Sequence, residues 1–184
     1  MELKYFETVA ACGYAEDIQS LLVLADKEFI PPLSARGSST QQNLTGTEAV
    51  SEGAKAYYAA MSTQPVVVAV ENDRCYGFMA FKKDYTCEYY EKLPNLYAST
   101  CVVHPDTRGK GLMKGFYQTM IDLFPERSVY TRTWHTNISH LKVLDKLGFT
   151  LLTRLPDHRG PGMDTVYYCR ETKQKGNFVS QNFG

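Results

Sequence analysis

The 184-residue sequence has no excess of one charge, because 20 lysine and arginine residues balance 20 aspartate and glutamate residues. A formal net charge of zero at pH 7 gives no global electrostatic support for binding nucleic acid or a membrane surface. We therefore expect neither nucleic acid nor membrane as a partner. Any basic site must be local.

Paired cysteines and long apolar runs are also missing. The five cysteines are an odd number, and none of them forms a Cys-x-x-Cys pair. The first residues show no basic segment followed by an apolar run, and no stretch approaches the length of a membrane span. We therefore expect no secretory leader, no structural disulfide and a cytoplasmic location with reduced thiols.

The sequence has little that favours a metal centre or several domains. None of its four histidines lies three or four residues from another with a supporting carboxylate, so we expect no bound metal. A hydrophobic content of 43% in 184 residues suffices for one core. We expect a single domain over residues 1–184, with a flexible polar tail from about residue 172, and we find no internal repeat.

Hydrophobic periodicity predicts an α/β protein with strands and helices mixed along the chain. A capping-box pattern, Thr45 with Glu48, is expected to open the second helix. Expected helices cover residues 15–29, 45–61, 112–124 and 138–147. Expected strands cover residues 3–9, 66–70, 75–81, 96–103, 128–133, 149–154 and 165–170, with a hairpin over 64–84.

Two connecting segments are longer than a simple turn requires. Residues 33–44 either line a binding site or form a plain mobile connection. Residues 82–95 carry several tyrosines and acids and form either a lid over a binding site or a solvated turn whose aromatic residues provide packing.

The most informative stretch is Val102-Val103-His104-Pro105-Asp106-Thr107-Arg108-Gly109-Lys110-Gly111-Leu112-Met113. It is typical of a strand that ends at a proline, a glycine-rich turn and the start of a helix. Free N–H groups at a helix start bind phosphate or pyrophosphate, and Arg108 and Lys110 would add charged contacts. The stretch lacks the Gly-Lys-Ser or Gly-Lys-Thr of a Walker loop and the third glycine of the dinucleotide fingerprint.

The pattern Val-x-Pro-x-x-Arg-Gly-x-Gly, followed by a second segment from Asn137 to Gly148-Phe149, resembles the GNAT superfamily of acyl-CoA-dependent N-acetyltransferases. The resemblance covers about residues 97–154. It implies a three-layer α/β fold with a mixed, twisted central sheet flanked by helices, and acetyl-CoA as co-substrate. It also implies the cofactor-binding residues Cys101, Val102, Val103, Arg108, Gly109, Lys110, Gly111, Leu112, Met113 and Asn137.

Two positions depart from the family pattern. Met113 stands where glycine or alanine is usual, which bears on how closely the helix approaches the cofactor. Leu144 stands where many members have the tyrosine that protonates the leaving thiolate, so the resemblance leaves the proton donor open.

Candidate catalytic residues are those that can move a proton at neutral pH. For the general base, the sequence offers Glu88, Glu91, His135, Asp164 and Tyr97, and none stands out. The proton donor is Tyr97, Tyr167, Tyr168, His135, a water molecule or no side chain at all. Cys101 is expected to be a buried, inert thiol rather than an acyl-carrying nucleophile. The predicted catalytic set is Glu88, Glu91, Tyr97 and His135.

The sequence thus predicts an N-acetyltransferase that transfers the acetyl group of acetyl-CoA to a primary amine by direct attack. The acceptor is a small-molecule or peptide amine, and a homodimer is an assembly that the resemblance allows. The alternative is a non-catalytic acyl-CoA-binding or sensor module of the same fold.

Overall fold

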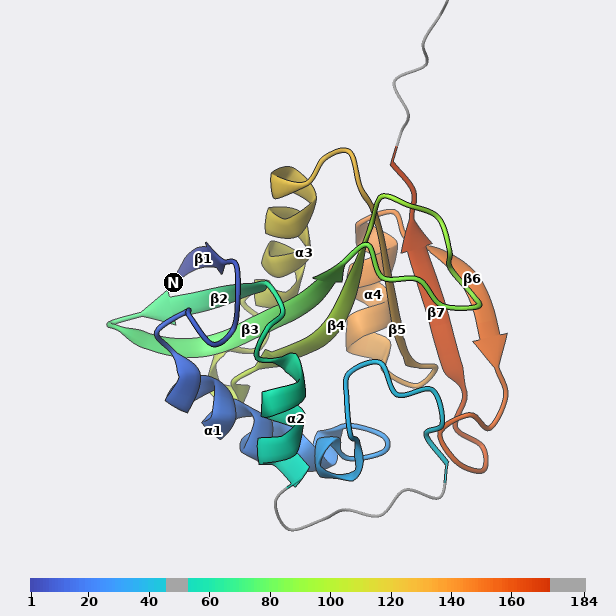
Figure 1. The fold of residues 1–184 in the computed structure, drawn as a ribbon, viewed down its shortest axis with the longest axis horizontal. Helices are drawn as coiled ribbons and strands as arrows, with labels where there is room; N and C mark the ends of the chain where they lie inside the picture. The colour runs from blue at the N-terminus through green and yellow to red at the C-terminus, as the bar shows by residue number, and fades with distance from the viewer. Residues whose placement is uncertain (46–52, 173–184) are drawn as a thin grey trace, which may run out of the picture.

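Seven strands form one mixed sheet in the computed structural model, which describes residues 1–45 and 53–172 (Figure 1). The strand order is β1-β2-β3-β4-β5-β7-β6. The strands are β1 (Glu2–Phe6), β2 (Val66–Glu71), β3 (Arg74–Lys83), β4 (Asn95–Val103), β5 (Ser128–Trp134), β6 (Thr150–Leu155) and β7 (Thr165–Arg170). The helices are α1 (Ala15–Ala25), α2 (Gly53–Met61), α3 (Leu112–Leu123) and α4 (Ile138–Lys146). This arrangement confirms the predicted α/β fold with a mixed, helix-flanked sheet.

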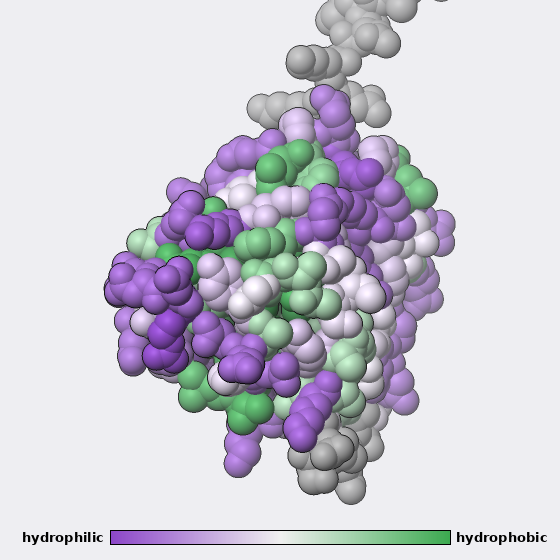
Figure 2. Space-filling model, turned by 60° about the vertical axis from the view of Figure 1, so that its left-hand side comes forward, coloured by the Kyte–Doolittle hydropathy of each residue, from purple (hydrophilic) through white to green (hydrophobic). Residues whose placement is uncertain are grey.

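Alternate residues of β2 face opposite layers of the molecule. Val66, Val68 and Val70 belong to the core under α1 and α2, whereas Val67 and Ala69 belong to the core under α3 and α4. Because both faces of the strand are covered, positions 66–70 are all apolar and form a continuous run. On the face in Figure 2, hydrophilic residues surround a central area of hydrophobic and near-neutral residues.

The central strand β4 leaves its neighbour β5 partway along its length. The two strands pair in parallel from Asn95 opposite Ser128 to Ala98 opposite Thr131, and the pairing stops there. On its other side β4 stays paired with β3 up to Val103. The central strand therefore splays away from β5 between the second half of β4 and the end of β5.

Backbone groups of β4 point into this gap. His104 N–H donates to Tyr76 O on β3 at 2.8 Å. Since the direction of N–H groups alternates along a strand, those of Cys101 and Val103 point away from β3. The Arg108 Nε–H donates to Val103 O at 3.3 Å from the same side.

The first strand and first helix are shorter than predicted. Strand β1 ends at Phe6, and α1 ends at Ala25, where a 3₁₀ turn (Asp26–Glu28) begins. The Asp26 carboxylate accepts from Ser34 N at 2.6 Å and from Ser34 Oγ at 2.9 Å, in the next 3₁₀ turn (Leu33–Ala35). This local bond competes with helix continuation, and Phe29 is extended.

Most other predicted elements are confirmed, including the hairpin, which is formed by β2 and β3, and α4 is followed by the left-handed Gly148 (φ 77°). The predicted capping box falls partly outside the described residues, because Glu48 is not among them, and so does the predicted tail after residue 172. Within residues 1–45 and 53–172, no helix combines the length and apolarity needed to cross a membrane.

The connection between β3 and β4 uses its aromatic residues for packing. Tyr85 lies 5.2 Å from Tyr97 and Tyr90 lies 4.5 Å from Tyr130, measured between ring centroids. The Tyr130 hydroxyl donates to Tyr85 O at 2.5 Å. These contacts tie the segment to the β4, β5 and β7 surface and favour the packing interpretation over a lid.

Candidate functional site

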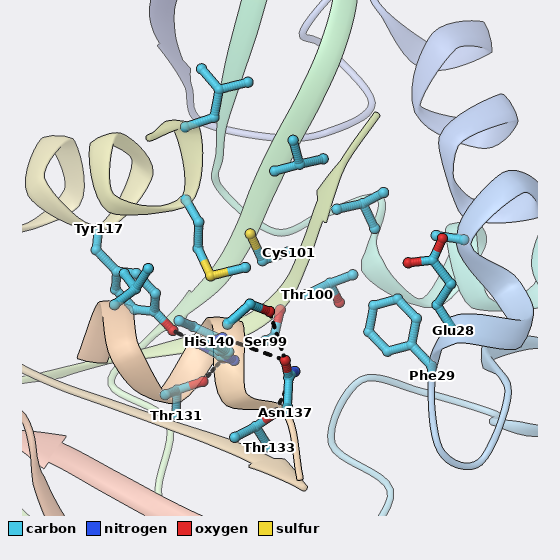
Figure 3. Close-up of a pocket in the computed structure, with 18 of the residues that line it drawn as sticks. Glu28, Phe29, Ser99, Thr100, Cys101, Tyr117, Thr131, Thr133, Asn137 and His140 are labelled. Atoms are coloured by element: carbon cyan, nitrogen blue, oxygen red, sulfur yellow. Dashed lines mark hydrogen bonds between the residues drawn. The ribbon is translucent and has the colours of Figure 1, made fainter. Parts of the chain in front are cut away.

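A cavity of about 450 Å³ occupies the gap where β4 and β5 part. Its wall combines the ends of both strands with the glycine turn, the start of α3, the start of α4 and the segment after α1. Figure 3 shows Glu28 and Phe29 on one side of the cavity and Tyr117 and His140 on the other, with Cys101 of β4 between them.

The glycine turn presents backbone N–H groups to this cavity. Gly109 and Gly111 have φ of 77° and 78°, a left-handed conformation that favours glycine. Gly111 is the N-cap of α3, and the first helical bond runs from Gly115 N to Gly111 O. The preceding helical N–H groups have no intrahelical acceptor. Such a turn fits a pyrophosphate.

The predicted cofactor residues are brought together here. All of them line the cavity except Lys110, which is exposed beside it. Arg108 is already paired, because its Nη2 lies 2.8 Å from both carboxylate oxygens of Glu28. This half-exposed pair joins the glycine turn to the segment after α1, so the predicted phosphate contact of Arg108 stays a prediction.

Asn137 holds the start of α4 against β5. Its Oδ1 accepts from His140 N at 3.4 Å, and its Nδ2 donates to Thr133 Oγ1 at 3.0 Å (Figure 3). The N-cap role is therefore present. Because Asn137 also lines the cavity, it is positioned for the predicted cofactor contact, which stays a prediction.

A buried tyrosine–histidine pair lines the cavity from α3 and α4. The Tyr117 hydroxyl and His140 Nε2 share a hydrogen bond of 2.8 Å (Figure 3). Burial lowers the pKa of His140 to about 4 and raises the pKa of Tyr117, so both groups are neutral at pH 7. Neither residue belongs to the predicted catalytic set. The available signal was a histidine within the helix that follows Asn137.

Leu144 and Cys101 differ in their position relative to the cavity. Leu144 is fully buried in the core under α3 and does not line the cavity. Cys101 does line it, and burial raises the pKa of its thiol to about 12. The thiol is protonated at neutral pH, in keeping with an inert cysteine.

Of the four predicted catalytic residues, the structure places Tyr97 in the cavity wall and the other three outside it. The buried Tyr97 hydroxyl donates to Ser39 O at 3.4 Å, and burial raises the pKa of Tyr97. His135 Nδ1 accepts from Asp164 N at 3.1 Å. Glu88 and Glu91 are exposed on the segment that packs through its tyrosines.

The cavity wall also contains three arginines that the sequence analysis did not select as a group. Arg36 comes from the 33–44 loop, Arg132 from β5 and Arg159 from the β6–β7 connection. Because Arg36 and Ser39 line the cavity, the structure favours a binding role for this loop over a plain connection. No cluster of three or more potential metal ligands occurs in the part of the chain that the structure describes.

Solved structures with the same fold include three acetyltransferase-related proteins. The protein yncA from Salmonella typhimurium, solved with its cofactor acetyl-CoA, is 16% identical with a TM-score of 0.61, and the match covers 96% of this chain and 97% of that one. Ribosomal-protein-alanine N-acetyltransferase from Brucella melitensis is 14% identical (TM-score 0.62; 93% and 99%). Aminoglycoside 6'-acetyltransferase type Ii is 16% identical (TM-score 0.63; 93% and 97%).

At these identities the similarity shows the fold alone. No curated protein sequence matches the chain. Residues 38–149, more than half of the sequence, match the acetyltransferase (GNAT) family. The geometry of the glycine turn and the parted strands agrees with that match. The chain therefore belongs to the acetyltransferase (GNAT) family.

Proposed function

We propose that this protein transfers the acetyl group of acetyl-CoA to a primary amine by direct attack. The observation that carries the proposal is one continuous cavity that joins the N–H groups of the glycine turn to those of the parted strand β4. The first set suits a pyrophosphate and the second suits an acyl carbonyl oxygen. The related fold of yncA with its cofactor acetyl-CoA supports the same assignment.

The residues of the chain fit this co-substrate at both ends. Gly109 and Gly111 expose the backbone where a phosphate must approach closely, and a side chain at either position would strain the left-handed turn. Acetyl-CoA supplies an acetyl group activated as a thioester. The N–H groups of Cys101 and Val103 would stabilise negative charge that develops on the carbonyl oxygen during attack.

We propose Tyr117 as the proton donor to the departing sulfur. Tyr117 lines the cavity, while Leu144 at the family's usual tyrosine position does not. If His140 carries its proton on Nε2, the imidazole donates to Tyr117 Oη, and the phenolic hydrogen is available to Thr131, which also lines the cavity, or to the departing sulfur. His140 would then be a positioning residue that favours the developing phenolate.

The amine must lose a proton before it attacks. Glu28 is the one carboxylate in the cavity wall among the described residues, and it is paired with Arg108. Three arginines surround the rest of the cavity, and nearby positive charge lowers the pKa of an amine. This environment favours the neutral amine and supports direct attack without a dedicated carboxylate base.

The scarcity of carboxylates in the cavity favours a second candidate, an acyl-CoA-binding module without turnover. Isothermal titration with acetyl-CoA, desulfo-CoA and ATP tests the site shared by both candidates, and release of free thiol with a panel of amines separates them. We expect both CoA compounds to bind, ATP to give no signal and at least one amine to release thiol. Binding without release from any amine would support the module, and absence of CoA binding would refute both.

A further inference from the structure

Three of the four arginines in the cavity wall, Arg36, Arg132 and Arg159, lie in surroundings that remove water from their charges. Arg36 and Arg159 are buried and Arg132 is half-buried. Their main partners are backbone carbonyl groups: Arg36 donates to Pro31 O at 2.7 and 3.0 Å, and Arg159 donates to Ile30 O at 2.5 Å. Arg132 donates to Gln41 O at 2.5 Å. A carbonyl dipole orients a guanidinium but leaves its charge uncompensated.

Each guanidinium also has an N–H donor that is not used in a hydrogen bond to the described residues. Among the described residues, no acceptor is found for Arg36 Nη1, Arg132 Nε or Arg159 Nη2. Arginine has five N–H donors in a planar fork, which suits a carboxylate. The cluster therefore has unused hydrogen-bonding capacity where it lines the cavity.

Aromatic rings hold two of these cations in place. Arg36 Cζ lies 5.5 Å from the centroid of the Phe29 ring, and Arg159 Cζ lies 5.6 Å from that of the Trp134 ring. The two rings are themselves 5.9 Å apart. Stacking of this kind fixes the guanidiniums in position without neutralising them.

The arginines also repel one another. Burial first, and then the neighbouring Arg36 and Arg132, lower the pKa of Arg159 to about 9. Glu28 does not relieve this repulsion, because both of its oxygens are bound by Arg108.

A buried group of like charges is costly unless an opposite charge joins it. Burial lowers the pKa of Arg36 and Asp26 opposes this shift from a distance, but the Asp26 carboxylate accepts from Ser34. Among the described residues no carboxylate forms an ion pair with Arg36, Arg132 or Arg159, so the cluster can take up a further anion from a ligand.

We infer that the acceptor is a small amine that carries a carboxylate, such as an α-amino acid, whose carboxylate binds among Arg36, Arg132 and Arg159. The inference rests on the proposed acetyl transfer and names its substrate class. Arg132 directly follows Thr131, the last residue of β5 paired with β4, so the arginine cluster borders the gap that exposes the N–H groups of Cys101 and Val103. A cavity of about 450 Å³ that also receives the cofactor's arm leaves space for a small acceptor.

In the transfer step, the amine nitrogen forms a bond to the acetyl carbonyl carbon and the thioester C–S bond breaks. The nitrogen loses one proton to solvent, and the sulfur gains one and leaves as a thiol. The carboxylate takes no part in bond making, and its binding orients the nitrogen.

Trp134 is the single tryptophan of the chain and lines the cavity, so its fluorescence reports occupancy. The probes are N-acetyl-L-amino acids, which are the products of the inferred reaction, and the matching N-acetyl-L-amino amides, which lack the negative charge. We expect saturable binding of at least one acid, with its amide about tenfold weaker or worse. Equal binding of every acid and amide, or no saturable binding of any acid, would overturn the inference.

The Arg132→Gln variant localises the anion site. We expect its affinity for the bound acid to fall about 10- to 100-fold, because one charged hydrogen-bonding group is lost. Arg74→Gln is the matched control, since Arg74 is exposed and lies outside the cavity wall. It should keep wild-type affinity. An unchanged affinity in folded Arg132→Gln would overturn the assignment of the anion site. If this variant does not fold, the comparison of N-acetyl acids with their amides in the wild type still tests whether the cavity binds a carboxylate.

Thiol release with free amino acids and amino amides separates this inference from the proposed function. Preferred turnover of amides or other uncharged amines would refute the anionic acceptor and leave the acetyltransferase intact. Selective binding of N-acetyl acids together with absent acetyl-CoA binding, measured by titration calorimetry, would refute the acetyltransferase and leave the anion site.

Discussion

The two ends of the cavity are built in opposite ways. Apart from Asn137, the proposed cofactor end uses one continuous stretch of chain, residues 101–113, and presents mainly backbone N–H groups. The proposed acceptor end collects Arg36, Arg132 and Arg159 from three segments far apart in the sequence and presents side-chain charge. A backbone site tolerates side-chain change but depends on local conformation, whereas a side-chain site depends on each residue and on the packing that brings it there.

Among the proposed substitutions, a side chain at Gly111 should have the largest effect, and it should change binding at the cofactor end alone. Gly111→Val should weaken acetyl-CoA binding about 100-fold or more, because two or more phosphate-facing N–H groups would turn away with the strained backbone. Titration calorimetry gives the affinity. Binding of N-acetyl acids, followed by Trp134 fluorescence, should be unchanged.

Gly148→Val is the matched control for strain. Gly148 has a φ of 77°, and like Gly111 it has no atom within 4 Å of an added Cβ, but it lies outside the cavity wall. Both variants should lose about 1–2 kcal/mol of unfolding free energy. Equal acetyl-CoA affinities in the two folded variants would show that the glycine turn is not the phosphate site.

Removal of the Tyr117 hydroxyl tests the chemistry between the two ends. Tyr117→Phe should lower kcat about 100-fold, at the low end of the effect of a lost general acid, and leave both binding affinities unchanged. Tyr130→Phe is the control, since the buried Tyr130 hydroxyl donates to Tyr85 O at 2.5 Å and neither residue lines the cavity. An unchanged kcat in Tyr117→Phe would show that the departing sulfur takes its proton from solvent and not from Tyr117.

His140 should make stability depend on pH. Burial lowers its pKa from 6.5 to about 4, so between these values the unfolded chain takes up a proton that the folded protein does not. The unfolding free energy should therefore fall as pH is lowered from 6.5 to 4, by about 3 kcal/mol from this residue. Urea unfolding across this range should show that component in the wild type and in His104→Gln, and its loss in His140→Gln. Equal pH profiles in all three proteins would contradict the buried, neutral imidazole.

The smallest effect is expected at Cys101. Its thiol is protonated, and the proposed role of this residue belongs to its backbone, so Cys101→Ala should keep kcat within about twofold. Mass spectrometry of the wild type incubated with acetyl-CoA should show no acetyl adduct. An adduct that disappears in Cys101→Ala would favour transfer through an acyl-enzyme.

Predictions from the sequence succeeded where neighbouring residues determine the structure. The hairpin, the central strand and the glycine turn follow from apolar runs and turn residues that lie next to one another. The end of α1 was predicted too late because Asp26 bonds Ser34 instead of continuing the helix. Glu88 and Glu91 had suitable chemistry for catalysis, but the tyrosines around them hold their segment against the sheet and away from the cavity.

By itself, the sequence determined the family fold and the glycine turn, because φ preferences, proline and hydrophobic periodicity act over a few residues. Only the tertiary structure decided that Tyr117 meets His140 across two helices and that three arginines gather around one gap. Such contacts join residues up to more than a hundred positions apart, and they arise from packing of the whole sheet and its helices, which no local pattern encodes.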